Sequence, residues 1–270
     1  MRISIVILIS VILAMPGFSN SFADDLEARK IMEKVDQRDE GDNQTAEMTM
    51  ILIDKKGNKR ERQLKVFSKD KNEDKQMLMF FLSPSDVKDT GFLTYDFDDP
   101  KKDDNQWLYL PALKKTKRIA SNDKSGSFMG SDLNYSDMTK RELEDYDFKF
   151  YAKGKQKKVN NIDTWVIWCL PRSKKIAKET GYSKVLLFVR QDNFVVTRTL
   201  AWEQESKYLK FLDVKKLEKI DGIWVSTYMS VTRKKGKVVT HKTHFILENI
   251  KFNQNLDDAL FTTRRMEKGL

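Results

Sequence analysis

A change of hydrophobic period near residue 45 is the feature that most constrains how this chain can fold. Residues 28–35 place apolar side chains at i, i+3, i+4 and i+7, the spacing of an amphipathic helix that Asp24 or Asp25 can cap. From Thr45 onward the apolar residues recur at every second position, which is the spacing of a strand with one buried face. The pattern therefore predicts a short helix followed by strands.

Runs with the period of two then follow one another to the end of the chain. Turn residues such as Asp192-Asn193, Asp221-Gly222 and Lys235-Gly236 separate them. Short connections without helices exclude a doubly wound α/β fold and predict a mainly β (α+β) fold with a large, curved antiparallel sheet. No linker or repeat divides residues 24–270, so we expect a single domain. The expected strands are 45–52, 60–67, 76–82, 92–97, 106–110, 115–120, 147–152, 164–170, 184–190, 195–202, 208–217, 223–233 and 238–250.

The first 23 residues have the features of a secretory signal peptide. Arg2 precedes an apolar run over 3–14, Pro16-Gly17 interrupts that run, and Ser21-Phe22-Ala23 is a small-x-small cleavage site. A buried N-terminal helix or strand is the competing interpretation, and it explains neither the breakers nor the small residues. Cleavage after Ala23 would remove one positive charge from a chain whose net charge is +10. The only cysteine, Cys169, has no disulfide partner and is expected to be a packed thiol.

Three of the expected strands are apolar on both faces, at 77–82, 165–170 and 185–189. A sheet with one face in water alternates apolar and polar residues, so these strands must be covered on both sides. Two interpretations stay open. The strands form a core beneath a helix, or they line a cavity for an apolar ligand, because a barrel with this many strands is too wide for side chains alone to fill.

Residues 121–138 depart from the strand pattern. They are rich in small residues, yet they carry large apolar groups at Phe128, Met129, Leu133, Tyr135 and Met138. A connection of this length in a compact domain is usually functional or disordered, and the placed apolar groups argue against disorder. We predict a lid or gate, and the alternative is a surface loop held by a few apolar anchors.

No residue pattern supports catalysis, a metal or a cofactor. Ser127 stands second in Gly-Ser-Phe-Met-Gly, whereas a nucleophile elbow needs the serine third. The two histidines, His241 and His244, are three apart in an expected strand and so point to opposite faces. The acidic residues within 96–104 fit no standard calcium loop. The prediction is a protein that is not an enzyme and has no metal or cofactor.

The excess of 50 basic over 40 acidic residues would suit a nucleic acid, but export argues against that partner. The basic residues are spread over strands and turns, where a solvated face that keeps sheet edges apart explains them. If they bind a partner, anionic lipid headgroups or an acidic transporter surface fit best. The residues expected to dock, beside the predicted gate, are Lys114, Lys115, Lys117 and Arg118.

A central motif resembles a known family. It runs from Gln106 to Lys115 as QWLYLPALKK, continues with Arg118-Ile119-Ala120-Ser121, and ends over 125–132 as SGSFMGSD. These stretches resemble the outer-membrane lipoprotein-sorting-like proteins, which are LolA/LolB-like domains of the periplasm often associated with transporters of the RND or MMPL type. The resemblance extends from the signal peptide to Leu260-Phe261-Thr262, which is nearly the whole chain.

The resemblance implies an incomplete β-barrel closed on one side by helices, with an apolar hollow that shelters acyl chains. It implies a periplasmic carrier that exchanges a lipid, a lipoprotein acyl chain or another hydrophobic molecule with an inner-membrane RND/MMPL-type exporter or the outer membrane. The alternative is a non-transporting accessory or regulatory module of an envelope transporter with a ligand-free core. The residues expected at the apolar cavity and its gate are Met48, Met50, Leu52, Trp107, Tyr109, Phe128, Met129, Leu133, Tyr135, Met138, Trp165 and Ile167.

Overall fold

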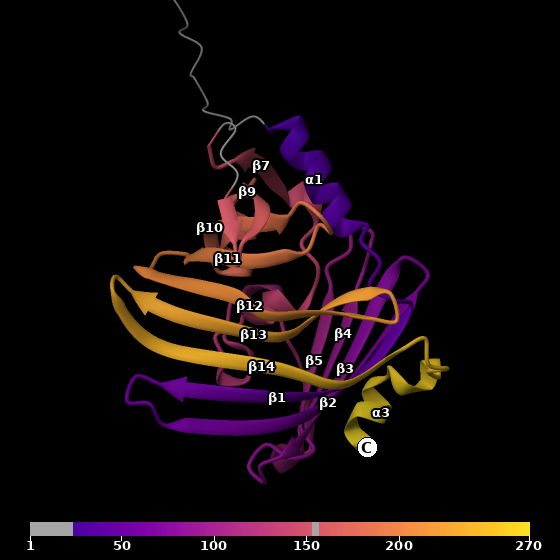
Figure 1. Cartoon of the computed structure of the whole chain (residues 1–270). Helices are drawn as coiled ribbons and strands as arrows, with labels where there is room; N and C mark the ends of the chain where they lie inside the picture. The colour runs from indigo at the N-terminus through magenta and orange to yellow at the C-terminus, as the bar shows by residue number, and fades with distance from the viewer. Residues whose placement is uncertain (1–23, 153–156) are drawn as a thin grey trace, which may run out of the picture.

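The computed structural model describes residues 24–152 and 157–270, so the expected signal peptide lies outside the described residues (Figure 1). The described residues form three α-helices and one antiparallel sheet of fourteen strands. The helices are α1 (Leu26–Asp36), α2 (Lys174–Thr180) and α3 (Thr263–Lys268). The strands are β1 (Asn43–Asp54), β2 (Lys59–Lys71), β3 (Asp74–Ser83), β4 (Gly91–Asp96), β5 (Asn105–Leu110), β6 (Lys115–Arg118), β7 (Tyr146–Phe150), β8 (Lys157–Val159), β9 (Ile162–Pro171), β10 (Tyr182–Arg190), β11 (Val196–Glu203), β12 (Tyr208–Ile220), β13 (Ile223–Lys235) and β14 (Val238–Phe252).

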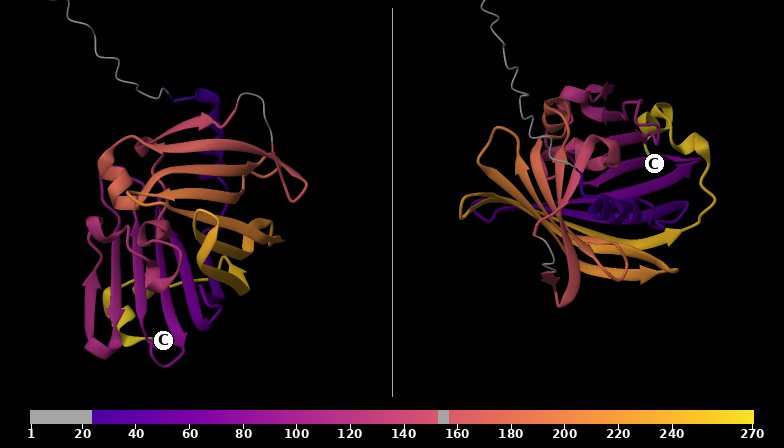
Figure 2. Two further views of the ribbon diagram at one scale, coloured as in Figure 1. Left: turned by 90° about the vertical axis from the view of Figure 1, so that its left-hand side faces the viewer. Right: turned by 90° about the horizontal axis from the view of Figure 1, so that it is seen from above.

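The sheet consists of two runs of neighbouring strands that meet where β14 pairs with β1. Strands β1 to β6 pair in chain order, and β7 and β9 to β14 do the same, with β8 beside β9. The two edges are therefore β6 and β7, and residues 119–145 connect them. Figure 1 shows β1 alongside β14 and β3–β5 running across the direction of β12–β14, and Figure 2 shows the same bend, so the sheet curves around an interior without closing. The predicted curved, mainly β sheet in the form of an incomplete barrel is confirmed.

The acidic residues at the start of α1 form the helix cap and join the helix to the sheet. The Asp25 carboxylate accepts hydrogen bonds from the backbone N–H groups of Glu27 (3.0 Å) and Ala28 (3.3 Å), as the sequence predicts for a cap. The Asp24 carboxylate accepts one from the N–H of Phe148 on β7 (2.7 Å), and the Asp25 N–H donates to the Phe148 carbonyl (2.8 Å). The start of α1 therefore satisfies backbone groups on the edge strand β7.

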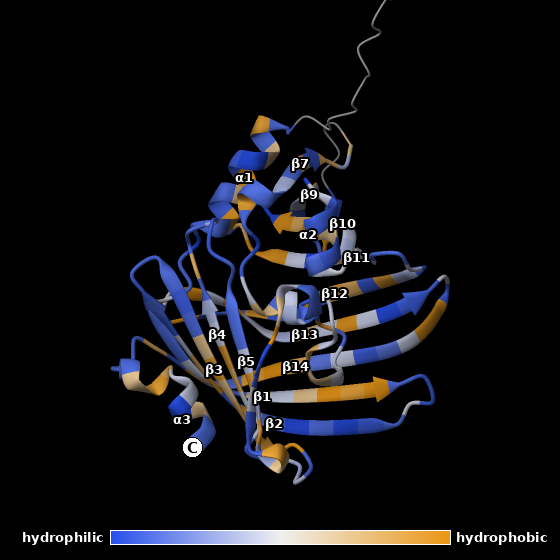
Figure 3. Cartoon of the chain, turned by 180° about the vertical axis from the view of Figure 1, so that it is seen from behind, coloured by the Kyte–Doolittle hydropathy of each residue, from blue (hydrophilic) through white to orange (hydrophobic). Residues whose placement is uncertain are grey.

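The outer face of the β3–β5 region is covered by the C-terminal segment. Phe261 and Met266 pack against Phe80 and Leu93 there. A side chain at Gly91 would collide with Met266, so the glycine allows α3 to approach β4 closely. Figure 3 shows α3 beside β3 on the outside of the sheet. The helix has six residues, too few for a recognisable period, and the sequence did not predict it.

An aromatic cluster fills the inner face of the β1–β5 half. The ring centroid of Phe128 lies 5.0 Å from that of Phe92, 5.7 Å from that of Tyr135 and 6.4 Å from that of Phe81. Phe128 is 1% exposed and comes from the segment between the two edge strands. The connecting segment therefore supplies part of the core.

None of the helices within the described ranges is long and apolar enough to cross a membrane.

We expect Phe128→Ala to lower the free energy of unfolding by about 3–5 kcal/mol, the usual cost of removing a fully buried aromatic ring. Chemical denaturation measures the change. Leu113→Ala is the matched control, because Leu113 is 62% exposed and its loss should change stability by less than about 0.5 kcal/mol. Equal stability of the two variants would contradict the placement of Phe128 in the core.

Candidate functional site

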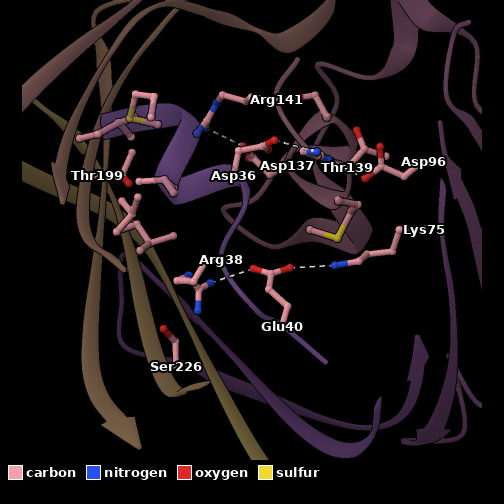
Figure 4. A pocket seen from close by; sticks show the side chains of 18 of the residues that line it. Asp36, Arg38, Glu40, Lys75, Asp96, Asp137, Thr139, Arg141, Thr199 and Ser226 are labelled. Carbon is pink, nitrogen blue, oxygen red and sulfur yellow. Dashed lines mark hydrogen bonds and ion pairs between the residues drawn. The ribbon is translucent and has the colours of Figure 1, made fainter. Parts of the chain in front are cut away.

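A cavity of about 750 Å³ lies in the other half of the interior, inside strands β9 to β14. The end of α1 and residues 133–143 of the connecting segment form its opposite wall (Figure 4). The cavity is continuous with the surface through an opening formed by residues 38–42 and by the turns that follow β2 and β4. This is the candidate functional site.

The strand wall of the cavity is apolar because of its pairing register. Leu212 on β12 lies opposite Val231 on β13, and Val214 lies opposite Met229. Met229 in turn lies opposite Phe245 on β14. These side chains line the cavity in adjacent rows, since directly opposed residues on a sheet share a face. The facing wall is mixed. Its apolar side chains are Met32, Val35, Leu133, Met138 and Leu143, and its polar ones are Asp36, Ser136, Asp137, Thr139, Lys140 and Arg141.

The opening of the cavity is charged. Glu40 joins two bases there, with its carboxylate 2.8 Å from Arg38 Nη2 and 2.7 Å from Lys75 Nζ (Figure 4). Burial alone would raise the pKa of Glu40, but Lys75 and Arg38 outweigh it and hold that pKa below its usual value. Lys140 Nζ lies 3.0 Å from Asp36 at the end of α1. The carboxylates around the opening are Asp36, Asp39, Glu40, Asp42, Asp70, Glu73, Asp96 and Asp98, against the bases Arg38, Lys75 and Lys140.

Asp96, at the end of β4, holds the connecting segment beside the opening. Its carboxylate accepts a hydrogen bond from the backbone N–H of Lys140 (2.8 Å). Burial and the nearby charge of Asp104 raise the pKa of Asp96 to about 6. Burial and the charges of Asp96 and Asp104 raise the pKa of Glu142 to about 7. Asp96 and Glu142 therefore gain protons close to neutral pH.

Buried polar contacts hold the connecting segment against β14. The Asp132 carboxylate accepts a hydrogen bond from Thr243 Oγ1 (2.7 Å), and the same oxygen lies 2.8 Å from His241 Nδ1. The backbone N–H of Asp132 donates to Thr243 Oγ1 (3.0 Å). Asp132 and Thr243 are both buried, so breaking these contacts would leave polar groups without partners. The segment is therefore fixed at its centre.

A buried lysine lies where the cavity meets a second pocket. Lys210 Nζ donates to Asn134 Oδ1 (2.6 Å) and to the Tyr182 hydroxyl (3.3 Å), and that hydroxyl donates to Asp137 (2.6 Å). Burial lowers the pKa of Lys210. The second pocket has a volume of about 620 Å³ and is lined mostly by residues with polar side chains. Lys210 lines both spaces, so this network forms the boundary between them.

The structure brings two of the residues predicted for the ligand site to the cavity, Leu133 and Met138, and both also pack against the core of the β1–β5 half. A second group packs in or against the core of the β1–β5 half: Met48, Met50, Leu52, Phe128, Met129 and Tyr135. Trp107 and Tyr109 lie outside the interior, against the cluster beneath α3. Trp165 stacks on Phe194 with ring centroids 5.5 Å apart, and Ile167 is fully buried in the cluster beneath α1. Ligand contact stays a prediction for all twelve residues.

The residues predicted to dock lie together on the sheet edge, where Lys114, Lys115, Lys117 and Arg118 are exposed. Their binding role stays a prediction. The two histidines are apart as predicted, since His241 contacts Asp132 and His244 Nδ1 lies 2.9 Å from the Tyr228 hydroxyl. Among residues 24–152 and 157–270 there is no group of three or more His, Cys, Asp or Glu residues arranged to hold a metal ion.

Cys169 is the packed thiol that the sequence predicts. It is 0% exposed at the back of the cavity, and burial raises its pKa to about 12. The charged opening and Lys210 were not predicted. By sequence alone, nothing distinguishes Arg38, Glu40 and Lys75 from ordinary surface residues. The one sequence signal for the opening was the high proportion of acidic residues over 36–42.

Comparison with known proteins gives one family and several similar folds. A family model described as an uncharacterized protein matches residues 73–268. A DUF1329 family protein from Desulfovibrio piger is similar with a TM-score of 0.80 and 28% sequence identity, covering 89% of this chain and 98% of that chain. A domain assigned to outer membrane lipoprotein sorting, from Vibrio parahaemolyticus, has a TM-score of 0.79, 28% identity and the same two coverages.

A LolA superfamily protein from Nitrosomonas europaea shares the fold at lower identity. Its TM-score is 0.65 at 18% identity, and the match covers 88% of this chain and 98% of that chain. None of the curated proteins matches this chain.

The raised pKa of Asp96 predicts a pH effect on stability. A carboxyl whose pKa is higher in the folded than in the unfolded state stabilises the fold as pH falls, so its contribution is lost as pH rises through about 6. As pH falls from about 8 to about 4, the Asp96 carboxyl should therefore raise the free energy of unfolding by at most about 3 kcal/mol. Asp96→Asn should remove this increase. Asparagine can still accept the Lys140 hydrogen bond.

Chemical denaturation over that pH range measures this difference. The control is Asp192→Asn, because Asp192 is exposed and paired with Arg190, whose hydrogen bond lowers its pKa. That variant should retain the increase. An Asp96→Asn profile parallel to that of the unmodified protein would contradict the raised pKa.

Proposed function

The chain belongs to the DUF1329 family of LolA-like proteins, and from that premise we propose that it is a carrier of hydrophobic molecules. It binds a lipid, a lipoprotein acyl chain or a similar molecule in the cavity inside β9 to β14. It performs no covalent chemistry. The assignment of the Vibrio parahaemolyticus relative to lipoprotein sorting supports this class of cargo, as does the periplasmic location that the signal sequence predicts.

The single observation that carries the proposal is the apolar cavity. Its volume of about 750 Å³ lies within the usual range of about 300–1,000 Å³ for small-molecule sites. Both long walls contribute apolar side chains, Leu212, Val214 and Met229 on one side and Leu133 and Met138 on the other, among polar residues such as Thr199 and Arg141. An acyl chain held there leaves water, and each buried methylene contributes about 0.8 kcal/mol. Ten buried methylenes would therefore contribute about 8 kcal/mol.

The charged opening fits the polar end of such a ligand. Asp39, Asp42 and Asp98 are exposed there, while the apolar side chains of the walls lie deeper. An amphiphile can therefore keep its headgroup in water and its chain in the cavity, which avoids the large cost of burying a polar group without partners. We propose that the ligand enters and leaves by this opening.

Delivery requires a partner that changes the relative stability of the bound and empty states. We propose an inner-membrane transporter of the RND or MMPL type, or the outer membrane, as the source or acceptor of the cargo. The exposed bases Lys114, Lys115, Lys117 and Arg118 remain the proposed docking residues for the transporter. A non-transporting accessory module with a ligand-free core is the competing function, and the ligand experiments below distinguish the two.

Filling the cavity should abolish binding without unfolding the protein. Thr199 and Ser226 both line the cavity (Figure 4). Thr199→Phe with Ser226→Phe should weaken binding of a fluorescent fatty-acid probe at least tenfold, because the two rings occupy the space of the chain. Titration of the probe by fluorescence measures the affinity.

Thr232→Phe is the matched control for that double variant. Thr232 lies on β13 next to the cavity residue Val231 and so points to the opposite face, and it does not line the cavity. This variant should bind the probe normally. Equal probe binding by the filled variant would show that the probe sits elsewhere.

Extraction of the protein purified from its native periplasm should release a bound hydrophobic molecule. Organic extraction followed by mass spectrometry identifies it, and the Thr199→Phe, Ser226→Phe variant should yield much less of it. A clean extract together with no probe binding would support the accessory module and end the carrier proposal.

A further inference from the structure

Two basic hairpin turns lie side by side at one end of the sheet. The β1–β2 turn spans 55–58, and the β13–β14 turn spans 236–237. Because β1 pairs with β14, Asp54 at the end of β1 lies opposite His241 near the start of β14, and Ile53 lies opposite Lys242. Figure 1 shows the two turns projecting from the same end of the molecule. We call residues 54–60 and 234–239 the twin turns.

The twin turns carry uncompensated positive charge. Residues 55–60 and 234–239 contain no acidic residue. The neighbouring Asp54 is already engaged, since its carboxylate accepts hydrogen bonds from the N–H groups of Lys56 (2.7 Å) and Asn58 (3.0 Å). No carboxylate of the described residues lies within ion-pair distance of any base in these turns. The bases are Lys55, Lys56, Lys59, Arg60, Lys234, Lys235 and Lys237.

Two apolar side chains project between these charges. Val238 is 65% exposed and Val239 is 42% exposed, directly after Lys237. Both valines begin β14, beyond the part of the strand that packs in the core. Exposed valines among lysines form an amphipathic tip, and of its bases Lys234 lies over the ring of Phe211 and Lys235 over the ring of Tyr208.

We propose that the twin turns dock this protein on the surface of an anionic lipid bilayer. Each lysine or arginine near such a surface adds to the electrostatic attraction, and seven bases together support peripheral binding. Val238 and Val239 add apolar contact at the level of the headgroups. The combination of exposed bases with exposed valines favours a lipid surface over an acidic protein, because a bilayer surface offers anionic headgroups and apolar contact together.

Docking by this end sets the direction of the cavity opening. Ser226 lines the cavity near the start of β13, and Lys235 ends the same strand nine positions later. A strand rises about 3.3 Å per residue, so the two lie about 30 Å apart. The docked protein would hold its opening away from the bilayer, where a protein partner can reach it. This inference concerns a surface and does not depend on the proposed carrier function.

Sedimentation with vesicles tests the proposal. The protein should bind vesicles of equal parts phosphatidylcholine and phosphatidylglycerol, should bind vesicles of phosphatidylcholine alone at least tenfold more weakly, and should be released by added salt. Replacing Lys55, Lys56, Lys235 and Lys237 together with Gln should lower partitioning to the anionic vesicles at least tenfold. Val238→Ser with Val239→Ser should also lower it, without changing its dependence on salt.

A charge-matched variant separates this surface from net charge. Lys30, Lys101, Lys102 and Lys174 are exposed and lie outside the twin turns, and replacing all four with Gln lowers the net charge equally. That variant should bind anionic vesicles like the unmodified protein. Equal losses in the two lysine variants, or no preference of the unmodified protein for anionic vesicles, would overturn the proposal whether or not the cavity binds a fatty probe.

Discussion

The constraint on which this structure depends is that the two edge strands of its sheet, β6 and β7, do not meet. An open sheet leaves backbone groups without partners at its edges, and it leaves one side of the interior without a covering strand. Two segments of the chain compensate for these two gaps. Asp24 and Asp25, at the start of α1, satisfy Phe148 on β7, and residues 119–145 cross the gap between the two edges. The interior is therefore bounded by a strand surface on one side and by a connecting segment on the other.

That connecting segment divides the interior into two regions of different character. Its first part places Phe128 among aromatic rings and fills the space inside the β1–β5 half. Its second part, from Leu133 to Leu143, leaves a cavity inside the β9–β14 half. The buried contacts of Asp132 and Lys210 hold the segment between the two regions, and removing a partner from a buried polar group costs more than the contact itself contributes. The cavity is thus a consequence of how firmly the segment is fixed.

Much of this fold was predictable, because alternating strands and the cap of α1 are local signals. The strands apolar on both faces were correctly expected to be covered twice: on β10, Leu187 faces the cluster beneath α1, while Leu186 and Phe188 face a second cluster on the other side. The sequence did not predict which face of each strand would line the cavity. Trp107 and Tyr109 face outward because α3, six residues long, covers them. Lys210 has the sequence character of a surface residue, and its burial follows only from long-range pairing.

The charges of the protein are distributed unevenly. Carboxylates gather around the opening, and bases gather at the twin turns. The proposed carrier function nevertheless depends on the cavity. Crystals soaked with a long-chain alcohol that carries bromine on its terminal carbon test it most directly, since anomalous scattering locates the end of the chain. We expect a bromine signal inside the cavity between Leu212 and Leu133. Bromine found only on the outer surface, with the cavity closed by its own side chains, would contradict it.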